Sequence, residues 1–159
     1  MNIRVGFGVD VHRLAEGLPL IIGGVNIPSE FGAVGHSDAD VLLHAICDAI
    51  LGAANLRDIG YHFSDKDPKY KGIDSRILLK DSYELVKGKG FTLMNIDCTV
   101  ILEKPKVNPH VEKMQSIISE ILELEIDCVS IKATTHERVD SFGESRAIKS
   151  YAVALLNKK

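Results

Sequence analysis

Apolar and polar residues alternate along four stretches of the chain, a pattern typical of β-strands. In the first stretch, residues 3–11, the apolar side chains share one face. The other three stretches are residues 91–102, 129–135 and 147–156. Residues 147–156 also contain several alanines, which would suit a helix, but we interpret them as a strand because the alternation runs through them. The apolar face of the first stretch consists of Ile3, Val5, Phe7, Val9 and Val11.

A Gly-Gly pair divides the apolar stretch 20–27 and predicts a short β-hairpin, which Pro28 ends. A helix is expected to follow Ser37, a common N-cap residue, and to continue to about residue 54. Asp40 stands three residues after the serine, where a capping box usually has Glu or Gln. The sequence therefore predicts a hairpin and then the first helix.

Two further helices are predicted from their end signals. Asp74 is placed to cap the second, and glycines at 88 and 90 end it. Its expected buried face consists of Leu78, Ser82, Leu85 and Val86. Asn108 and Pro109 suit the N-cap and first position of the third helix. The polar stretch 61–72 before the second helix predicts a loop. The apolar stripe of the third helix consists of Val111, Met114, Ile118, Ile121 and Leu122.

Strands and helices that follow one another in this way indicate an α/β fold, with a four- to five-stranded mixed sheet covered by helices. The length of 159 residues is usual for one domain. No internal repeat, low-complexity segment or linker interrupts the chain. We therefore expect a single domain over residues 1–159.

Composition and charge narrow the function classes. Apolar residues make up 45% and charged residues 26%, which is typical of globular proteins and excludes a disordered or collagen-like chain. The net charge is −3 and basic residues form no long run, so a nucleic-acid-binding face is not expected. The most apolar stretch, residues 41–56, contains His44, Asp48 and Gly52, and we expect no membrane span.

The N-terminus and the cysteines indicate a cytoplasmic protein, or one of an organelle stroma if a targeting peptide has been removed. The N-terminus begins a strand pattern at once, without the charged and apolar regions of a secretion signal. Cys47, Cys98 and Cys128 are odd in number, far apart and set in apolar stretches, which predicts buried reduced thiols. They include no C-x-x-C pair, so a zinc site made from cysteines is not favoured.

The first candidate site combines a strand and a helix. Asp10 and His12 lie two residues apart in the first strand, so their side chains point to the same side. His44 lies two turns into the first helix, and Asp48, four residues later, could hold its second ring nitrogen. The first three residues could bind zinc and leave a fourth position open. On spacing alone, structural histidines with turn and cap aspartates are the favoured alternative.

Three polar stretches are further candidates. Residues 58–60 and 63–68 could contact a ligand or form a solvated loop with Asx turns. Residues 102–108 join a strand to a helix, where backbone N–H groups beside Lys106 could hold a phosphate, or they are an ordinary connection. Residues 132–137 place hydroxyls beside the Glu137 carboxylate, which suits a phosphate–magnesium site and also an exposed strand end.

Taken together, these segments resemble the 2-C-methyl-D-erythritol 2,4-cyclodiphosphate synthase family along nearly the whole chain. No single motif carries the resemblance; the order and spacing of several do. The matching pieces include Gly8-Val9-Asp10-Val11-His12, His36-Ser37-Asp38-Ala39-Asp40, Asp58-Ile59-Gly60, Phe63-Ser64-Asp65 and Lys132-Ala133-Thr134-Thr135.

The resemblance implies a reaction of the non-mevalonate isoprenoid pathway. The 2-phosphate of 4-diphosphocytidyl-2-C-methyl-D-erythritol 2-phosphate attacks the β-phosphorus of its own diphosphate, and CMP leaves. The resemblance also implies a homotrimer with active sites between subunits and a small nucleotide-linked substrate. Zinc is implied at Asp10, His12 and His44, and a second divalent ion, magnesium or manganese, at Glu137.

The same resemblance implies roles for individual residues. His36 and Thr135 match positions that stabilise the transition state. Residues 102–108 and 134–137 match the cytidine-diphosphate pocket. The implied substrate contacts are Asp10, Val11, His12, His36, Ser37, Asp58, Ile59, Gly60, Phe63, Ser64, Asp65, Lys66, Asp67, Leu102, Glu103, Lys104, Pro105, Lys106, Val107, Asn108, Thr134, Thr135, His136 and Glu137.

The chain departs from the family pattern near its C-terminus. Family members commonly have a stretch like F-x-G-R-x-E-G, whereas residues 141–147 read S-F-G-E-S-R-A. The acid and the arginine are exchanged, as Glu144 and Arg146. In the family that arginine lines a central cavity able to hold an isoprenoid diphosphate, and this departure leaves such binding open here. A non-catalytic binding module on the same fold is the competing hypothesis, against which the complete set of ligand positions argues.

Overall fold

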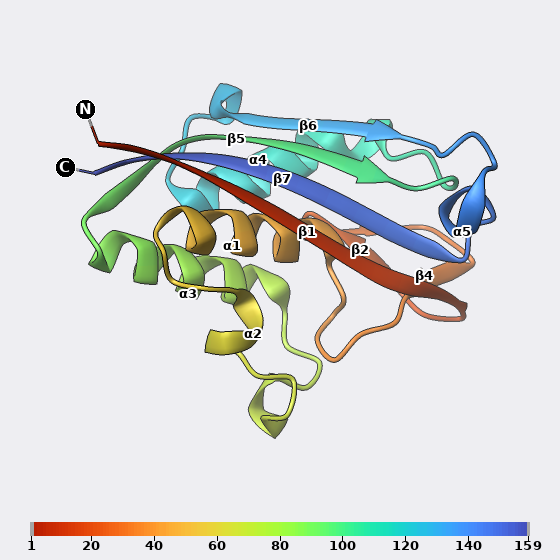
Figure 1. Cartoon of the computed structure of the whole chain (residues 1–159). Coiled ribbons are helices and arrows are strands. Elements are labelled where there is room, and N and C mark those ends of the chain that lie inside the picture. Colours follow the sequence, from red (N-terminus) through yellow and green to blue (C-terminus); the bar gives the residue numbers. More distant parts are fainter. Residues whose placement is uncertain (1, 159) are drawn as a thin grey trace.

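The computed structural model describes residues 2–158, in which three long strands form the centre of a five-stranded sheet (Figure 1). The strand order is β4-β1-β7-β5-β6. β1 and β7 are antiparallel, as are β7 and β5, whereas β5 and β6 are parallel. The predicted mixed sheet is confirmed. The strands are β1 (Ile3–Glu16), β4 (Phe31–Ala33), β5 (Phe91–Ile101), β6 (Val129–Thr134) and β7 (Ala147–Lys158).

A separate hairpin and three long helices complete the core. The hairpin pairs β2 (Leu20–Ile22) with β3 (Val25–Ile27), as predicted. One contiguous apolar cluster joins the sheet, the hairpin and the long helices. The helices are α1 (Val41–Ala53), α3 (Ser75–Gly88) and α4 (Val111–Leu122), with the short α2 (Ile59–His62) and α5 (Asp140–Gly143). Among residues 2–158, no helix has the length and apolar composition needed to cross a membrane.

The two faces of β1 have opposite roles. The five apolar residues of the outer face are each between 42% and 67% exposed. They are Ile3, Val5, Phe7, Val9 and Val11. The inner face, which carries Gly6, Gly8, Asp10 and His12, is turned toward α1. A Cβ atom added at Gly8 would lie 1.9 Å from the carbonyl oxygen of Ala45. The strand prediction is confirmed, and glycine, not the large apolar side chains, marks the face against which the helix packs.

The predicted cap of the first helix is wrong. The N-cap is Asp40, whose side chain accepts hydrogen bonds from the N–H groups of Leu42 and Leu43. The same carboxylate also accepts from Gly23 and Gly24 of the hairpin. Asp40 is fully buried. Because Asp40 and not Ser37 is the N-cap, the helix starts three residues later than predicted. Burial raises the pKa of Asp40 to about 6. The four N–H groups that donate to its carboxylate favour the ionised form, but burial outweighs them.

The other helix predictions are confirmed in part. Asp74 caps α3 as expected, but Leu85 is 39% exposed, outside the buried stripe of that helix. Residues Asn108–His110 form a 3₁₀ turn whose N-cap is Val107, and α4 begins at Val111 with His110 as its N-cap, so the predicted cap at Asn108 is wrong. The stretch 61–72 is mostly irregular, with the end of α2 and a 3₁₀ turn at Pro68–Tyr70.

The last strand and two of the cysteines lie as predicted. Residues 147–156 belong to β7, the middle strand of the sheet. Cys47 and Cys98 are buried free thiols, and burial raises the pKa of each to about 12. Cys128 is also free but only half-buried, because it ends a 3₁₀ turn at the start of β6. The prediction that all three are buried is therefore wrong for Cys128.

Candidate active site

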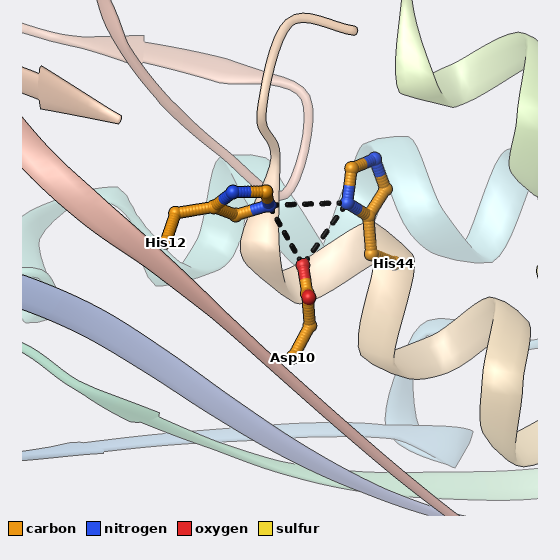
Figure 2. Close-up of side chains that lie close together, drawn as sticks. All are labelled: Asp10, His12 and His44. Carbon is orange, nitrogen blue, oxygen red and sulfur yellow. Dashed lines mark hydrogen bonds and ion pairs between the residues drawn. The ribbon is translucent and has the colours of Figure 1, made fainter. Parts of the chain in front are cut away.

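Three side chains from β1 and α1 meet below the inner face of the sheet. Figure 2 shows the Asp10 carboxylate and the His12 and His44 rings pointing toward one another. Asp10 Oδ2 lies 2.8 Å from His12 Nε2 and 3.0 Å from His44 Nδ1. The two ring nitrogens are 3.3 Å apart. The three ligand atoms lie within 4.8 Å of one another and could hold a metal ion, the interpretation that the spacing left open and the family resemblance implies.

The close approach of α1 to β1 makes this meeting possible. Long side chains on the inner face of β1 would keep the α1 backbone away from the sheet. Gly6 and Gly8 remove that spacing, and their α-carbons face the carbonyl oxygens of Ala49 and Ala45. Ala45 follows His44 directly, so the glycines bring the turn that carries His44 within reach of Asp10.

The ring nitrogen of His12 that faces away from the site has an unambiguous partner. His12 Nδ1 lies 3.0 Å from the backbone carbonyl oxygen of Val34. A carbonyl can only accept, so Nδ1 carries the proton and Nε2 turns its lone pair toward Asp10. A neutral His12 is thereby held in the tautomer that a metal ligand needs.

The predicted partner of His44 is wrong. Asp48 accepts a hydrogen bond from the backbone N–H of Ile59 at 2.8 Å and so fixes the entry to α2. His44 Nε2 instead lies 2.8 Å from Ser75 Oγ and 3.1 Å from Ser37 Oγ. Asp48 lies four residues after His44 on the same helix, which is why the sequence favours it as the partner. The observed partner Ser75 is 31 residues away and is brought to His44 by α3. No local sequence pattern marks Ser75 or the Val34 carbonyl as part of this site.

The electrostatics of the three side chains favour a bound cation. Burial on its own would raise the pKa of Asp10, but hydrogen bonds and charge from His12 and His44 outweigh it and lower the pKa to about 2. Burial would likewise lower the pKa of His12, but Asp10 outweighs it and raises that pKa. With both rings neutral, only lone pairs converge here. Such a set of acceptors needs a proton or a metal ion between them.

A cleft of about 400 Å³ opens beside the three ligand atoms. Several of the predicted substrate positions line it, namely His36, Ser37, Ile59, Gly60, Phe63 and Asp65. We call this the metal cleft. Phe63 packs edge-on against Tyr70, with ring centroids 5.6 Å apart. The Val11 side chain, 53% exposed on the outer face of β1, does not line the metal cleft.

Other predicted positions near the cleft form local turns. Asp58 is the N-cap of α2 and accepts from the N–H of Tyr61. Ser64 Oγ accepts from the N–H of Lys66, and Asp67 accepts from that of Lys69. The alternative interpretation of residues 58–68 as Asx-type turns therefore holds for these side chains. The same turns present Phe63 and Asp65 to the cleft.

The remaining predicted positions lie elsewhere on the sheet. Residues 102–108 and 134–137, which we call the sheet-end segments, are adjacent, and the Leu102 N–H donates to the Thr134 carbonyl. Thr135 Oγ1 donates to Glu137 at 2.9 Å. The sheet-end segments contribute no residue to the metal cleft. In the part of the chain that the structure describes, Glu137 belongs to no group of three or more possible metal ligands.

The strand order sets the distance between the metal-ligand candidates and the sheet-end segments. Strand pairing connects Val11 to Lys149, Ile101 and Thr134 in one row across the sheet. Three spacings of about 4.8 Å separate the ends of this row by roughly 14 Å. One chain therefore does not bring the sheet-end segments and the metal ligands together.

Comparison with known proteins places these features in a family. Residues 3–157 match the model of the YgbB family. A 2-C-methyl-D-erythritol 2,4-cyclodiphosphate synthase from Porphyromonas gingivalis is 57% identical over 153 residues, which are 96% of this chain and 94% of that protein.

Two solved structures share the fold. The bifunctional IspDF from Campylobacter jejuni is 40% identical with a TM-score of 0.96, and the match covers 99% of this chain but only 43% of that longer one. A 2C-methyl-D-erythritol-2,4-cyclodiphosphate synthase in a CDP-bound form is 36% identical with a TM-score of 0.90, covering 97% of this chain and 100% of that one. The order of elements, the convergent ligand set and the full-length similarity together establish that this chain belongs to the YgbB family.

Proposed function

We propose that this chain is a metal-dependent 2-C-methyl-D-erythritol 2,4-cyclodiphosphate synthase, a phosphorus–oxygen lyase of the non-mevalonate isoprenoid pathway. The convergence of Asp10, His12 and His44 beside the metal cleft is the single observation that carries the proposal. The names of relatives that are similar over nearly the whole chain support it. We also propose that residues 1–159 form one synthase domain that acts in the cytoplasm.

The proposed reaction takes place within one substrate molecule, 4-diphosphocytidyl-2-C-methyl-D-erythritol 2-phosphate. An oxygen of the 2-phosphate bonds to the β-phosphorus. The bond from that phosphorus to the oxygen bridging to the α-phosphorus breaks, and CMP leaves with the electron pair. A phosphate oxygen already carries the negative charge of a nucleophile, so positioning and charge neutralisation are the main tasks.

The residues of the metal cleft suit these tasks. The lone pairs of His12 Nε2 and His44 Nδ1 and the Asp10 carboxylate would hold zinc. A zinc ion bound there would supply positive charge to the phosphate oxygens. Ser37 and residues 58–60 would orient the methylerythritol part. His36, which lines the cleft, would stabilise the transition state together with Thr135 from the sheet-end segments.

The sheet-end segments would bind the cytidine diphosphate part of the substrate. A relative that binds CDP supports a nucleotide pocket in this fold. Residues 102–108 and 134–137 would enclose the nucleotide. Glu137 would hold a second divalent ion, magnesium or manganese, with oxygen ligands from the substrate phosphates.

A homotrimer would bring the metal cleft of one subunit next to the sheet-end segments of another. The roughly 14 Å between β1 and β6 along one row of the sheet supports contributions from different subunits. The exposed outer face of β1 supports a subunit interface, because contiguous exposed apolar surface is uncommon on monomers. Phe7 stacks on Tyr151 of β7 across this face, with centroids 5.8 Å apart.

Complementation between two inactive variants tests the shared site. His12→Ala damages the metal part and Glu137→Ala the nucleotide part, and each protein alone should release no CMP from the substrate. After subunit exchange, some mixed trimers contain one undamaged site, and CMP release should return. Exchange confirmed by mass without any return of activity would contradict a site shared between subunits. A wild-type protein that binds zinc and CDP but releases no CMP would instead be a binding module.

A further inference from the structure

The far side of His44 is held by a chain of hydrogen bonds that leads away from the metal cleft. His44 Nε2 lies 2.8 Å from Ser75 Oγ. Ser75 is fully buried in the first turn of α3. Its hydroxyl donates to Asp38 Oδ1 at 2.5 Å, and its backbone N–H donates to Asp38 Oδ2 at 3.0 Å. Both oxygens of the Asp38 carboxylate therefore accept from Ser75, and Oδ1 also accepts from the Asp40 N–H at 3.2 Å.

These contacts decide where the proton of His44 lies. Ser75 has one hydroxyl proton, and the Asp38 carboxylate can only accept, so that proton lies between the two side chains. Toward His44 the serine oxygen presents a lone pair and accepts from Nε2–H. A neutral imidazole with its proton on Nε2 has its lone pair on Nδ1. Nδ1 is the nitrogen that faces Asp10 and His12.

We infer that Asp38, acting through Ser75, is a positioning residue that holds His44 in its metal-binding tautomer. The inference rests on the metal site of the proposed function, and it adds Asp38 as the residue that orients the Ser75 hydroxyl beside His44. Partners of this kind around a metal ligand typically change metal affinity by about 10- to 100-fold when they are removed.

Asp38 also has a structural role, which can be separated from this one. Its backbone N–H donates to the Ile73 carbonyl, and the Gly72 N–H donates to that of His36. These backbone bonds tie residues 36–38 to residues 72–73 and do not involve the Ser75 hydroxyl. Ser75→Ala removes the hydrogen bond to His44 and leaves both backbone hydrogen bonds in place. The second contact of His44 Nε2, Ser37 Oγ at 3.1 Å, is longer and comes from a hydroxyl free to rotate.

Asp38→Asn tests the same link without removing an atom from Ser75. An asparagine offers one neutral acceptor oxygen, whereas three donors face the Asp38 side chain, namely the hydroxyl and N–H of Ser75 and the N–H of Asp40. In either orientation of the amide the carboxylate charge is lost, and a neutral amide holds the Ser75 hydroxyl proton less strongly than a carboxylate does. The hydroxyl proton can then turn to His44 Nε2 and favour the tautomer with the proton on Nδ1, which opposes metal binding.

Zinc affinity and the tautomer of His44 are the two measurements. Metal-free wild type, Ser75→Ala, Asp38→Asn and Ser82→Ala are titrated with zinc in competition with a chromophoric chelator. The first two variants should bind zinc about 10- to 100-fold more weakly, and Ser82→Ala should stay within about twofold of wild type. Ser82 is a matched control because it is fully buried in α3, two turns beyond Ser75. Long-range ¹H–¹⁵N spectra of the metal-free proteins should show the Nε2–H tautomer of His44 in wild type and its loss in Asp38→Asn.

The outcomes separate this inference from the proposed function. Unchanged zinc affinity and an unchanged His44 tautomer in Ser75→Ala and Asp38→Asn would overturn the inference and leave the proposed function intact. If Ser75→Ala fails to fold, Asp38→Asn decides the question by itself. A wild type that binds no zinc would contradict the metal site of the proposed function, and the tautomer comparison would still decide the role of Asp38.

Discussion

The two faces of strand β1 differ in the size, exposure and chemistry of their side chains. The outer face carries large apolar side chains that are 42% to 67% exposed. The inner face carries two glycines and then the metal-ligand candidates Asp10 and His12. Helix α1 packs so closely on the inner face that a Cβ atom at Gly6 would lie 1.8 Å from the Ala49 carbonyl oxygen.

The more hydrophobic face of a strand is therefore not necessarily the face that is buried within its own chain. Close backbone approach requires small residues, so the glycines determine where the helix packs. Large apolar residues left on the other face favour contact with another molecule. In this chain the inner face builds the metal site, and the outer face is the surface through which we propose that subunits assemble.

The largest effect is expected on the inner face, from His12→Ala. Zinc binding depends on all of its few protein ligands, so loss of one should lower zinc affinity and CMP release on the order of 10³-fold or more. The fold should persist, because His12 lies beside the cleft and not within the apolar cluster. Metal analysis and a CMP-release assay measure both losses. His110→Ala, on the 3₁₀ turn before α4, is the control. Stoichiometric zinc in purified His12→Ala would show that the ligand set is misassigned.

The next effect is expected on the outer face, from Phe7→Lys. Burying an unpaired ammonium at a subunit interface costs several kcal/mol, so assembly should weaken by at least about 10²-fold. Sedimentation or native mass spectrometry should show monomers that still bind zinc but release no CMP. Leu85→Lys, at an exposed apolar residue of α3, should leave the assembly unchanged. A Phe7→Lys protein with the mass of the wild-type oligomer would exclude this face as the interface.

A smaller effect is expected from Gly8→Ala, which breaks the close packing without touching a ligand. The added Cβ would meet the Ala45 carbonyl oxygen at 1.9 Å, so α1 must shift, at a cost of about 3 kcal/mol in the free energy of unfolding. Gly52→Ala is the matched control, since nothing lies within 4 Å of its Cβ and it sits in a helix. It should stabilise the protein by about 0.5–1 kcal/mol. Equal unfolding midpoints for both variants would contradict this account of the inner face.

The smallest effect is the pH dependence that Asp10 and His12 give to the metal-free protein. The pKa of Asp10 falls from 3.8 to about 2 on folding, so its contribution of about 2 kcal/mol is present above pH 3.8 and is lost as the pH falls toward 2. The pKa of His12 is raised above 6.5, so its contribution is present below pH 6.5 and is lost as the pH rises through the folded value.

The two contributions overlap between about pH 4 and 6.5. In this window the difference in unfolding free energy between wild type and Asp10→Asn should be greatest. Urea titrations of both proteins, stripped of metal, measure this difference at each pH. A difference that stays constant from acid to neutral pH would show that the pair does not stabilise the metal-free fold.

Much of the fold and the centre of the site could be predicted from the sequence, because short-range physics governs them. The alternation of residues 3–11 and 147–156 identifies strands, since successive side chains of a strand point to opposite faces. Asp74 identifies the start of α3, because its side chain caps the N–H groups next to it. Asp10 and His12 share a face for the same reason of periodicity.

The tertiary structure decided what depends on residues far apart in the chain. It turned the glycine face of β1 toward α1, and it gave His44 the partner Ser75 in place of Asp48. It also set the sheet-end segments, which lie at the ends of β5 and β6, two and three strands away from β1 and its metal-ligand candidates. Local patterns reach only a few residues along the chain. The partner of a side chain across the core depends instead on which helices and strands pack together, and only the packing of the whole molecule determines that.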